Sequence, residues 1–206
     1  VGIAAPGDDP YIDAGSVSRT ISSASGGNFE ALVVNPAAAV TVIADTTDTT
    51  VLSLSATPTV AEGGTITYTA TLTNAAQTPV TVTLSTGETI TIAAGATTGT
   101  VDIAAPADDA FIDAGIVSRT IAGATGGNFE SRVINPTAAT TAVTDTVDVT
   151  TVSLSATASV TEGGTIVYTA TLTNAADTPV TVSLSNGTTI TNAARATTGA
   201  ASGGAP

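Results

Sequence analysis

Three carboxylates that stand within six consecutive residues are the side chains best suited to chemistry, and the group occurs twice. Asp108, Asp109 and Asp113 follow Pro106, and the same arrangement stands 100 positions earlier. Carboxylates crowded in this way repel one another unless a cation lies among them. Ca²⁺ is the natural candidate, because it accepts about six to eight oxygen ligands in a flexible geometry, whereas Mg²⁺ demands a tighter octahedron. The spacing is not that of an EF-hand, so the sequence predicts a calcium site of another kind.

Three separate stretches of the chain bring carboxylates to one end of the predicted domain. In a sandwich of about seven strands, alternate loops fall at the same pole. The loop after the first strand carries Glu62, the loop after the fifth carries the acidic group just described, and an acidic linker follows the last strand. The opposite pole carries a Gly-Gly-Asn-Phe-Glu loop that reaches the linker of the preceding domain. The cation site expected at each domain junction therefore has Glu62, Asp108, Asp109, Asp113, Asp145 and Asp148 as ligands, completed by Asn128 and Glu130.

Each of these residues also has a purely structural interpretation, which the sequence leaves open. Asp108 and Asp109 also fit a turn in which the side chain accepts a hydrogen bond from its own backbone, although the cation site is the favoured interpretation. Glu62 precedes two glycines and fits a solvated turn, and Asn128 and Glu130 are ordinary loop residues. Two further expectations concern structure alone. We expect Arg19 and Arg119 on the outer face of a strand, where each pairs with a carboxylate at little energetic gain. We expect Asn186-Gly187-Thr188 to form a hairpin turn rather than a glycan site.

The elements that must position these residues repeat along the chain. Residues from Val1 onward match those from Val101 onward almost position by position, so the chain is a tandem array of one small domain. The acidic, Thr-rich linkers that end at Asp48 and Asp148 mark the expected boundaries. The predicted organisation is the C-terminal half of an immunoglobulin-like repeat in residues 1–47, a complete repeat in 48–147 and the N-terminal half of a repeat in 148–206. The tail Ala201–Pro206 departs from the repeat and is expected to lose the strand pattern, and Asn192 and Arg195 replace Ile92 and Gly95.

Short runs with a period of two residues, separated by turn signals, predict an all-β fold of tandem immunoglobulin-like antiparallel β-sandwich domains, each of about 100 residues. Thr and Val crowd every segment and the apolar runs lack a helical period, so we expect almost no helix. Gly63 and Gly64 are predicted to turn the chain after the first strand, and Ser85-Thr86-Gly87-Glu88 to form a hairpin. The expected strands of the complete repeat are Val51–Thr57, Thr65–Thr73, Pro79–Ser85, Thr89–Ile92, Thr97–Ala104, Ile116–Ile121 and Arg132–Thr144.

Composition argues against several classes of protein. The chain has no Cys and no His, hence no thiol nucleophile, no disulfide and none of the usual zinc ligands. Its few bases are all Arg, so the common general bases are missing and we do not expect an enzyme. A net charge of −13 disfavours nucleic acid as a partner. No apolar stretch approaches the roughly 18 residues needed to span a bilayer, so membrane insertion is not expected.

Taken together, the motifs resemble those of a known family. Ala61-Glu62-Gly63-Gly64-Thr65, Pro79-Val80-Thr81-Val82, Asp108-Asp109 and the loop Gly126–Glu130 resemble the extender repeats of giant RTX-type bacterial adhesins secreted by a type I system. They are similar, more distantly, to calcium-binding cadherin and Calx-β sandwiches. The resemblance implies stacked immunoglobulin-like domains on the bacterial cell surface, rigidified by calcium between domains and projecting a ligand-binding tip. The positions that match the motif, and so inherit a calcium-binding role, are Glu62, Asp108, Asp109, Asp113, Asp145 and Asp148, with equivalents Asp8, Asp9, Asp13, Asp45, Asp48 and Glu162.

The function expected from the sequence is that of an extracellular spacer in a large adhesin, stiffened by Ca²⁺ at its junctions and supporting cell adhesion and biofilm formation. Its partners would be neighbouring repeats of the same chain or head-to-tail copies of itself. The main alternative is a self-assembling extracellular fibre or surface-layer subunit, in which half domains of neighbouring chains complete one another. A ligand- or ice-binding surface of Thr rows and a glycan-active enzyme are less favoured, because the Thr pattern follows from β-propensity and no aromatic sugar platform accompanies the acids.

Overall fold

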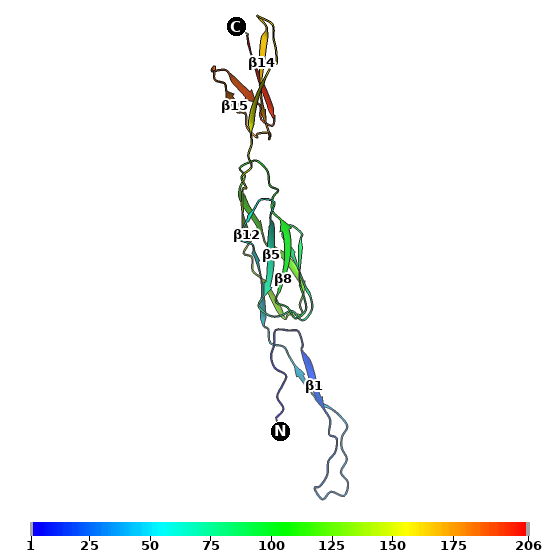
Figure 1. Cartoon of the computed structure of the whole chain (residues 1–206). Coiled ribbons are helices and arrows are strands. Elements are labelled where there is room, and N and C mark those ends of the chain that lie inside the picture. The colour runs from blue at the N-terminus through cyan, green and yellow to red at the C-terminus, as the bar shows by residue number, and fades with distance from the viewer. Residues whose placement is uncertain (1, 205–206) are drawn as a thin grey trace. The chain divides into compact units, whose positions relative to one another are not determined.

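The computed structural model describes residues 2–204, and within this range it contains strands and turns but no helix (Figure 1). The predicted fold class, all-β with tandem β-sandwich domains, is confirmed. β-Branched Thr and Val favour the extended backbone, and alternate residues along a strand face the core. The strands are β1 (Gly15–Arg19), β2 (Ala39–Ile43), β3 (Thr49–Ala56), β4 (Thr59–Ala61), β5 (Thr65–Leu72), β6 (Val80–Leu84), β7 (Thr89–Ile92), β8 (Thr98–Ala104), β9 (Gly115–Arg119), β10 (Ile121–Gly126), β11 (Ser131–Ile134), β12 (Ala139–Thr144), β13 (Val152–Ala156), β14 (Thr165–Leu172), β15 (Val180–Ser183), β16 (Thr189–Asn192) and β17 (Thr198–Gly204).

The chain divides into two compact units, each assembled from three separate stretches. The first contains the N-terminal part up to Thr57 together with Thr67–Ile103 and Ser118–Thr140. The second contains Pro58–Ile66, Ala104–Val117 and the part of the chain from Thr141 onward. Both units therefore draw on residues far apart in the sequence.

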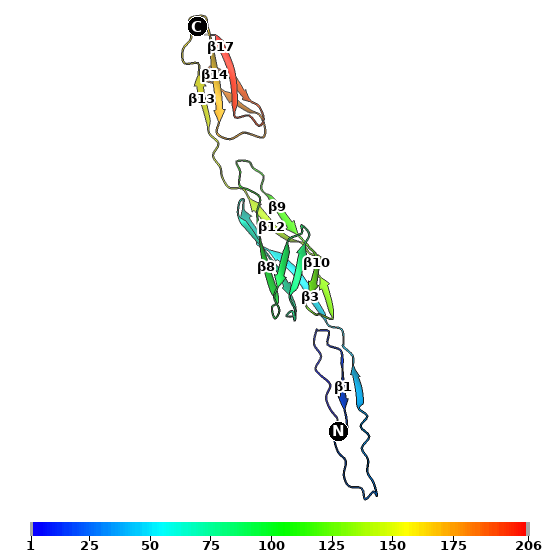
Figure 2. The ribbon, with the colours of Figure 1, turned by 90° about the vertical axis from the view of Figure 1, so that its right-hand side faces the viewer.

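The core of the first unit lies between two sheets (Figure 2). One sheet has the order β11-β3-β5-β8 and the other β10-β6-β7, so β3 and β6 each have a partner strand on both sides. Every second residue of β5 and β6 is buried, as expected for strands with one face toward a core. The largest fully buried side chains of this unit are Tyr68 of β5, Leu52 of β3 and Leu84 of β6, joined by Ile90 and Ile92 of β7.

Two strand predictions for the complete repeat need correction. The single strand predicted at Arg132–Thr144 is two strands, β11 and β12, which belong to different sheets. The break contains Pro136, which has no backbone N–H for a ladder, and the Asn135 Oδ1 atom accepts the Thr137 N–H at 3.0 Å. The strand predicted at Ile116–Ile121 ends at Arg119, and Ile121 begins β10, a strand that was not predicted. The short strand β4 was also missed.

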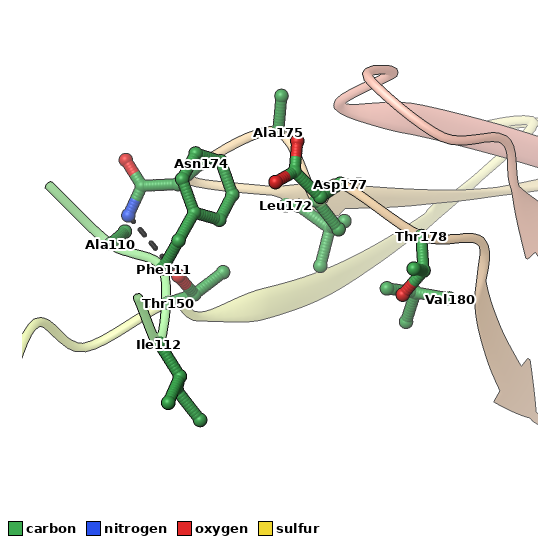
Figure 3. A pocket seen from close by; sticks show the side chains of 11 residues that line it. Ala110, Phe111, Ile112, Thr150, Leu172, Asn174, Ala175, Asp177, Thr178 and Val180 are labelled. Carbon is green, nitrogen blue, oxygen red and sulfur yellow. Dashed lines mark hydrogen bonds between the residues drawn. The ribbon is translucent and has the colours of Figure 1, made fainter. Parts of the chain in front are cut away.

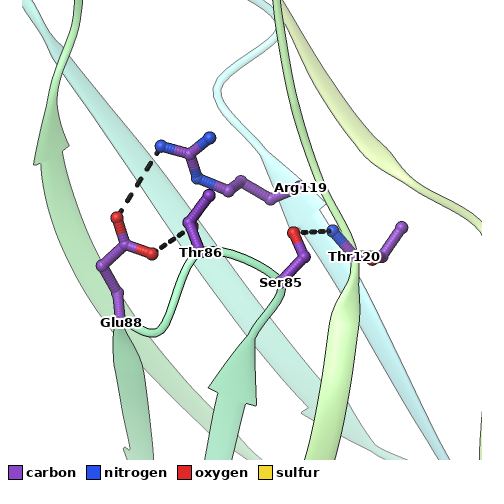
Figure 4. A network of polar contacts seen from close by, with 5 residues as sticks. All are labelled: Ser85, Thr86, Glu88, Arg119 and Thr120. Carbon is purple, nitrogen blue, oxygen red and sulfur yellow. Dashed lines mark hydrogen bonds and ion pairs between the residues drawn. The ribbon is translucent and has the colours of Figure 1, made fainter.

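The predicted hairpin after β6 is confirmed, and polar contacts surround its turn (Figure 4). Gly87 has a φ of 97°, and its N–H donates to the Leu84 carbonyl at 3.0 Å. Glu88 accepts a hydrogen bond from the Thr86 hydroxyl and pairs with Arg119, whose Nη2 lies 3.7 Å from Oε1. Arg119 thus has the carboxylate partner expected of it, but the expected exposed position is wrong, because its side chain is only 19% exposed. The hairpin at Asn186–Thr188 is confirmed as well.

In the second unit, β12 pairs with β4 in parallel and lies between β4 and β9. The third repeat contributes the sheet β13-β14-β17 and the hairpin β15-β16, with Ala170, Leu172 and Ile190 buried. The expected loss of strand pattern after Ala200 is wrong for residues 201–204, because β17 pairs with β14 through Gly204. A ladder needs backbone groups rather than particular side chains, so Ser and Gly sustain it. The rest of that tail lies outside the described residues.

The first repeat forms one hairpin, in which β1 pairs with β2 from Gly15–Ile43 to Arg19–Ala39. Residues 20–38, which connect these strands, contain no strand. The positions equivalent to β10 and β11, 21–26 and 31–34, lie in this connection. Among the large apolar side chains of residues 20–38, Ile21, Phe29, Leu32 and Val33 are exposed and Val34 is half-buried.

Candidate metal centre

Glu62 is held in a tight turn that joins three stretches of the second unit. It follows β4, and its N–H donates to the Thr144 carbonyl of β12 at 3.0 Å. The next residue, Gly63, has a φ of 68° and donates its N–H to the Pro106 carbonyl at 2.7 Å, at the start of the acidic loop. The glycine is needed because a side chain is strained in this left-handed backbone conformation. The turn therefore bonds to both the loop and the last strand of the complete repeat.

This turn brings Glu62 together with Asp113 and Asp145. Each of the three residues has a carboxylate oxygen within 4.8 Å of the other two. Glu62 is only 7% exposed, Asp145 is half-buried and Asp113 is exposed. The Asp113 N–H donates to Asp145 Oδ1 at 3.3 Å, which fixes the loop against the linker. In the described part of the chain this is the one group of three acidic side chains so close together.

The electrostatics of the triad are unfavourable without a cation. The Oε2 atom of Glu62 is buried and has no hydrogen-bond partner. Sharing a proton with the Asp113 carboxylate raises the pKa of Glu62 to about 7, and burial and the charges of Asp113, Asp145 and Asp109 act in the same direction. A buried carboxylate without a compensating charge or hydrogen bond is costly. Protonation of Glu62 or a bound cation would each remove this cost.

The donor set fits Ca²⁺. Three carboxylates supply hard, anionic oxygen atoms, and their unequal exposure leaves room for water or carbonyl ligands, which Ca²⁺ accepts. The unpartnered Oε2 atom of Glu62 offers a ligand that no protein donor occupies. Beside it lies a cavity of about 140 Å³, lined by Glu62, Pro106, Asp113, Gly115, Ile116 and Val143, among others.

The other acidic residues predicted for this site do not join the triad. Asp108 accepts a hydrogen bond from the hydroxyl of Thr146, so it ties the acidic loop to the linker. Asp109 accepts the Phe111 N–H at 2.8 Å, the local turn contact that the sequence left open as an alternative. Asp148 is exposed and lines an open pocket together with Asp109 and Phe111.

The first copy of the acidic loop has the same local contacts. Thr46 donates to Asp8, the Tyr11 N–H donates to Asp9 Oδ1 at 2.9 Å, and the Asp13 N–H donates to Asp45 Oδ2 at 3.2 Å. The pKa of Asp13 is raised, chiefly by the negative charge of Asp9. The described structure places no glutamate in the role of Glu62 here, and the acids instead line a cavity of about 430 Å³ together with Glu130. Glu162, the third-repeat equivalent of Glu62, is exposed.

Asn128 and Glu130 do contact the acidic loop of the preceding repeat, chiefly through backbone groups. The Ile12 N–H donates to the Asn128 carbonyl at 3.1 Å, and the Glu130 N–H donates to the Pro10 carbonyl at 3.2 Å. The Glu130 Oε2 atom accepts the Asp48 N–H at 2.7 Å. The sequence thus identified residues that meet this loop, although as hydrogen-bonding partners and not as part of the carboxylate triad.

Sequence reasoning missed the aromatic contact beside these hydrogen bonds. Tyr11 stacks on Phe129 with ring centroids 5.9 Å apart, and its hydroxyl donates to the Ala75 carbonyl at 2.6 Å. Phe129 is 8% exposed. A signal for the pair was present, because an aromatic residue stands at each of these two positions in both copies of the repeat: Tyr11 and Phe111, Phe29 and Phe129.

Comparison with known proteins gives one result. The model of a protein family, the LapA domain, matches residues 1–46, 48–146 and 148–206. A search of curated proteins found no match. Across residues 2–204, no helix has the length and apolar character required to cross a membrane.

Proposed function

Because this chain belongs to the LapA-domain family, which is adhesin-related, we propose that it is an extracellular spacer of a bacterial cell-surface adhesin, stiffened by calcium where consecutive repeats meet. The family membership supports a role in cell adhesion and biofilm formation at the cell surface. Tandem repetition supports a spacer, because copies of one small domain add length, whereas catalysis gains little from identical neighbours.

The observation that carries the calcium proposal is the state of Glu62. Its buried Oε2 atom lacks a hydrogen-bond partner and lies in a group with Asp113 and Asp145. These residues come from the turn after β4, from the acidic loop and from the residue after β12. A cation bound to all three would fasten the start of the linker to the body of the complete repeat. Without it, repulsion among the carboxylates would loosen the linker.

In this proposal, Ca²⁺ bound to the folded chain would raise its free energy of unfolding. A ligand that binds only the folded protein stabilises it by about 2.7 kcal/mol when its free concentration is about 100 times its Kd. A core built almost without large aromatic residues leaves a modest margin of stability, so this contribution would be noticeable. The acidic residues would act in this proposal as structural ligands and not as acid or base catalysts.

Small-angle X-ray scattering and calorimetry of the chain, in millimolar calcium and then in excess chelator, test the proposal. We expect chelation to lower the melting temperature and to make the particle bend or compact. Mg²⁺ at the same concentration serves as the matched control and should restore little. An unchanged melting temperature and unchanged dimensions in chelator would show that calcium is not the stiffening element.

A further inference from the structure

One end of the complete repeat is braced by contacts within that repeat. The Gly127 N–H donates to Thr78 Oγ1 at 3.0 Å, and the Gly127 carbonyl accepts the Gln77 N–H at 3.2 Å. The Asn128 amide donates to Gln77 Oε1 at 2.7 Å. The turn of residues 75–78 and the loop of residues 127–130 are therefore fixed to each other, and together they form what is called below the receiving end.

Residues 10–12 of the first repeat lie on the receiving end as a short additional strand. Tyr11 and Phe129 stand opposite each other in an antiparallel bridge. The Ile12 N–H donates to the Asn128 carbonyl at 3.1 Å, and the Pro10 carbonyl accepts the Glu130 N–H at 3.2 Å. Backbone bonds of this kind hold a segment without selecting its sequence, so selectivity must come from side chains.

The side chain that contacts both parts of the receiving end is Tyr11. Its ring stacks on Phe129 with centroids 5.9 Å apart and planes inclined by 27°, and its hydroxyl donates to the Ala75 carbonyl at 2.6 Å. Phe129 is buried and Tyr11 is half-buried. A half-buried aromatic residue with a satisfied hydroxyl is a typical anchor of a small contact surface.

Charge does not favour this contact. Asp8, Asp9, Asp13 and Glu130 line one cavity of about 430 Å³, and carboxylates gathered in this way repel one another. Among residues 2–204, no ion pair joins the loop to the receiving end. Asp9 acts inside its own loop, where its Oδ1 atom accepts the Tyr11 N–H at 2.9 Å. The ring contact and the uncharged hydrogen bonds therefore hold the loop against the repulsion.

The aromatic residue of the second acidic loop lies at the corresponding turn of the third repeat. Phe111 stands where Tyr11 does in the first copy, and it lines a cavity of about 410 Å³ together with Asn174 and Ala175 (Figure 3). Ala175 is the counterpart of Ala75, whose carbonyl binds the Tyr11 hydroxyl. An aromatic ring thus meets the same turn in both copies, although Phe has no hydroxyl for the carbonyl.

We propose that the receiving end binds the acidic loop of the preceding repeat through the aromatic residue of that loop, and that this fastening needs no cation. Tyr11 anchors the first loop on the complete repeat, and Phe111 has the same part toward the third repeat. The partner that fits the surface is an aromatic residue whose N–H is held by an aspartate two positions before it, as Asp9 holds Tyr11 and Asp109 holds Phe111. The inference rests on the proposed spacer function and deepens it, because it adds a fastening that remains when calcium is removed.

Amide hydrogen exchange of the whole chain, followed by NMR in calcium and in chelator, tests the proposal. The N–H groups of Ile12 and Glu130 are the reporters, because each donates across the contact. We expect both to be protected in both solutions, and Y11A to speed their exchange at least about tenfold. Y11F, which keeps the ring, should retain most of the protection. F111A is the matched control and should leave both reporters as in the wild type.

The amides of β5 and β6 show whether a variant still folds. Unchanged protection there, with faster exchange of the two reporters in Y11A, is the result expected. Reporters that exchange freely in the wild type, or at the same rate in Y11A, would overturn the proposal. Protection that disappears in chelator would also overturn it, because the fastening would then need the cation. Added salt should not speed the exchange, since it screens repulsion and breaks no ion pair; faster exchange in salt would show an ionic contact instead.

This proposal and the calcium proposal fail separately. A melting temperature that ignores calcium, with protected reporters that Y11A releases, would overturn calcium stiffening and leave the aromatic fastening in place. A melting temperature that depends on calcium, with reporters that Y11A does not change, would do the opposite. Glu62, Asp113 and Asp145 form none of the described contacts of Tyr11, so E62Q should leave both reporters unchanged.

Discussion

Glu62 and Asp113 lie on different loops, yet a carboxylate oxygen of one is within 4.8 Å of an oxygen of the other. Glu62 is buried and its Oε2 atom lacks a partner, whereas Asp113 is exposed. Two carboxylates so close together are stable only if one is protonated or a cation lies between them. The raised pKa of Glu62 makes the local structure sensitive to pH, and the proposed calcium site would make it sensitive to calcium as well.

Replacing Glu62 with Gln should abolish most of the stabilisation by calcium while leaving the chelated protein at least as stable as before. The amide has nearly the shape of the carboxylate but removes one charge from the triad. E162Q is the matched control, because Glu162 is exposed and occupies the same position of the third repeat. Calcium titration calorimetry and melting curves with and without chelator measure the effect. Identical calcium responses of E62Q and wild type would show that Glu62 is not a ligand.

In chelator, stability should fall as the pH rises from about 5 to about 7.5. The pKa of Glu62 is raised from its ordinary value of 4.5 to about 7 in the folded chain. Between these values the folded state binds a proton that the unfolded state has released, so the free energy of unfolding decreases with rising pH. Calcium requires the ionised carboxylate, so its affinity should rise over the same range. Melting temperatures at a series of pH values measure this, and E62Q should remove the slope.

Truncating Phe129 should destabilise the chain strongly, whereas truncating Phe29 should not. Phe129 is 8% exposed and stacks on Tyr11, and Phe-to-Ala changes in buried positions cost about 3–5 kcal/mol. Phe29 is 67% exposed, so F29A should change the free energy of unfolding of the dilute chain by less than about 0.5 kcal/mol. Urea unfolding at low protein concentration compares the two variants. Equal losses would mean that Phe29 is already buried in the single molecule.

Replacing Asn192 with Ile should stabilise the third repeat. Asn192 is 1% exposed and its Oδ1 atom is buried without a partner, although Nδ2 donates to the carbonyls of Ala170 and Thr197 at 3.3 and 3.2 Å. Ile92 occupies the equivalent position and is fully buried. Removing the unsatisfied oxygen should gain about 1 kcal/mol.

Thermal unfolding followed by circular dichroism measures the gain, with I92N as the reciprocal variant. I92N should destabilise the complete repeat, because it introduces a polar side chain into a filled apolar position. A loss of stability in N192I would show that the two amide hydrogen bonds outweigh the unsatisfied oxygen.

Several structural features were predictable from residue pattern alone. The hairpin at Ser85–Glu88 was predictable because Gly87 supplies the left-handed backbone that the turn requires. The strand Thr89–Ile92 was predicted with its observed bounds. The division of Arg132–Thr144 between two sheets could not be predicted from the residue pattern. The alternation of side chains continues past Pro136, but the partner strands change from β3 for β11 to β4 and β9 for β12.

The sequence by itself determined that this chain is a tandem β protein with acidic loops at equivalent positions, because alternation, turn residues and repetition are local properties of the chain. Only the tertiary structure decided which acids meet. Glu62, Asp113 and Asp145 converge, whereas Asp108 bonds to Thr146 and Asp109 to a backbone N–H. The reason is that strand pairing brings loops together from distant parts of the sequence, and the direction of each side chain is set by the turn that holds it.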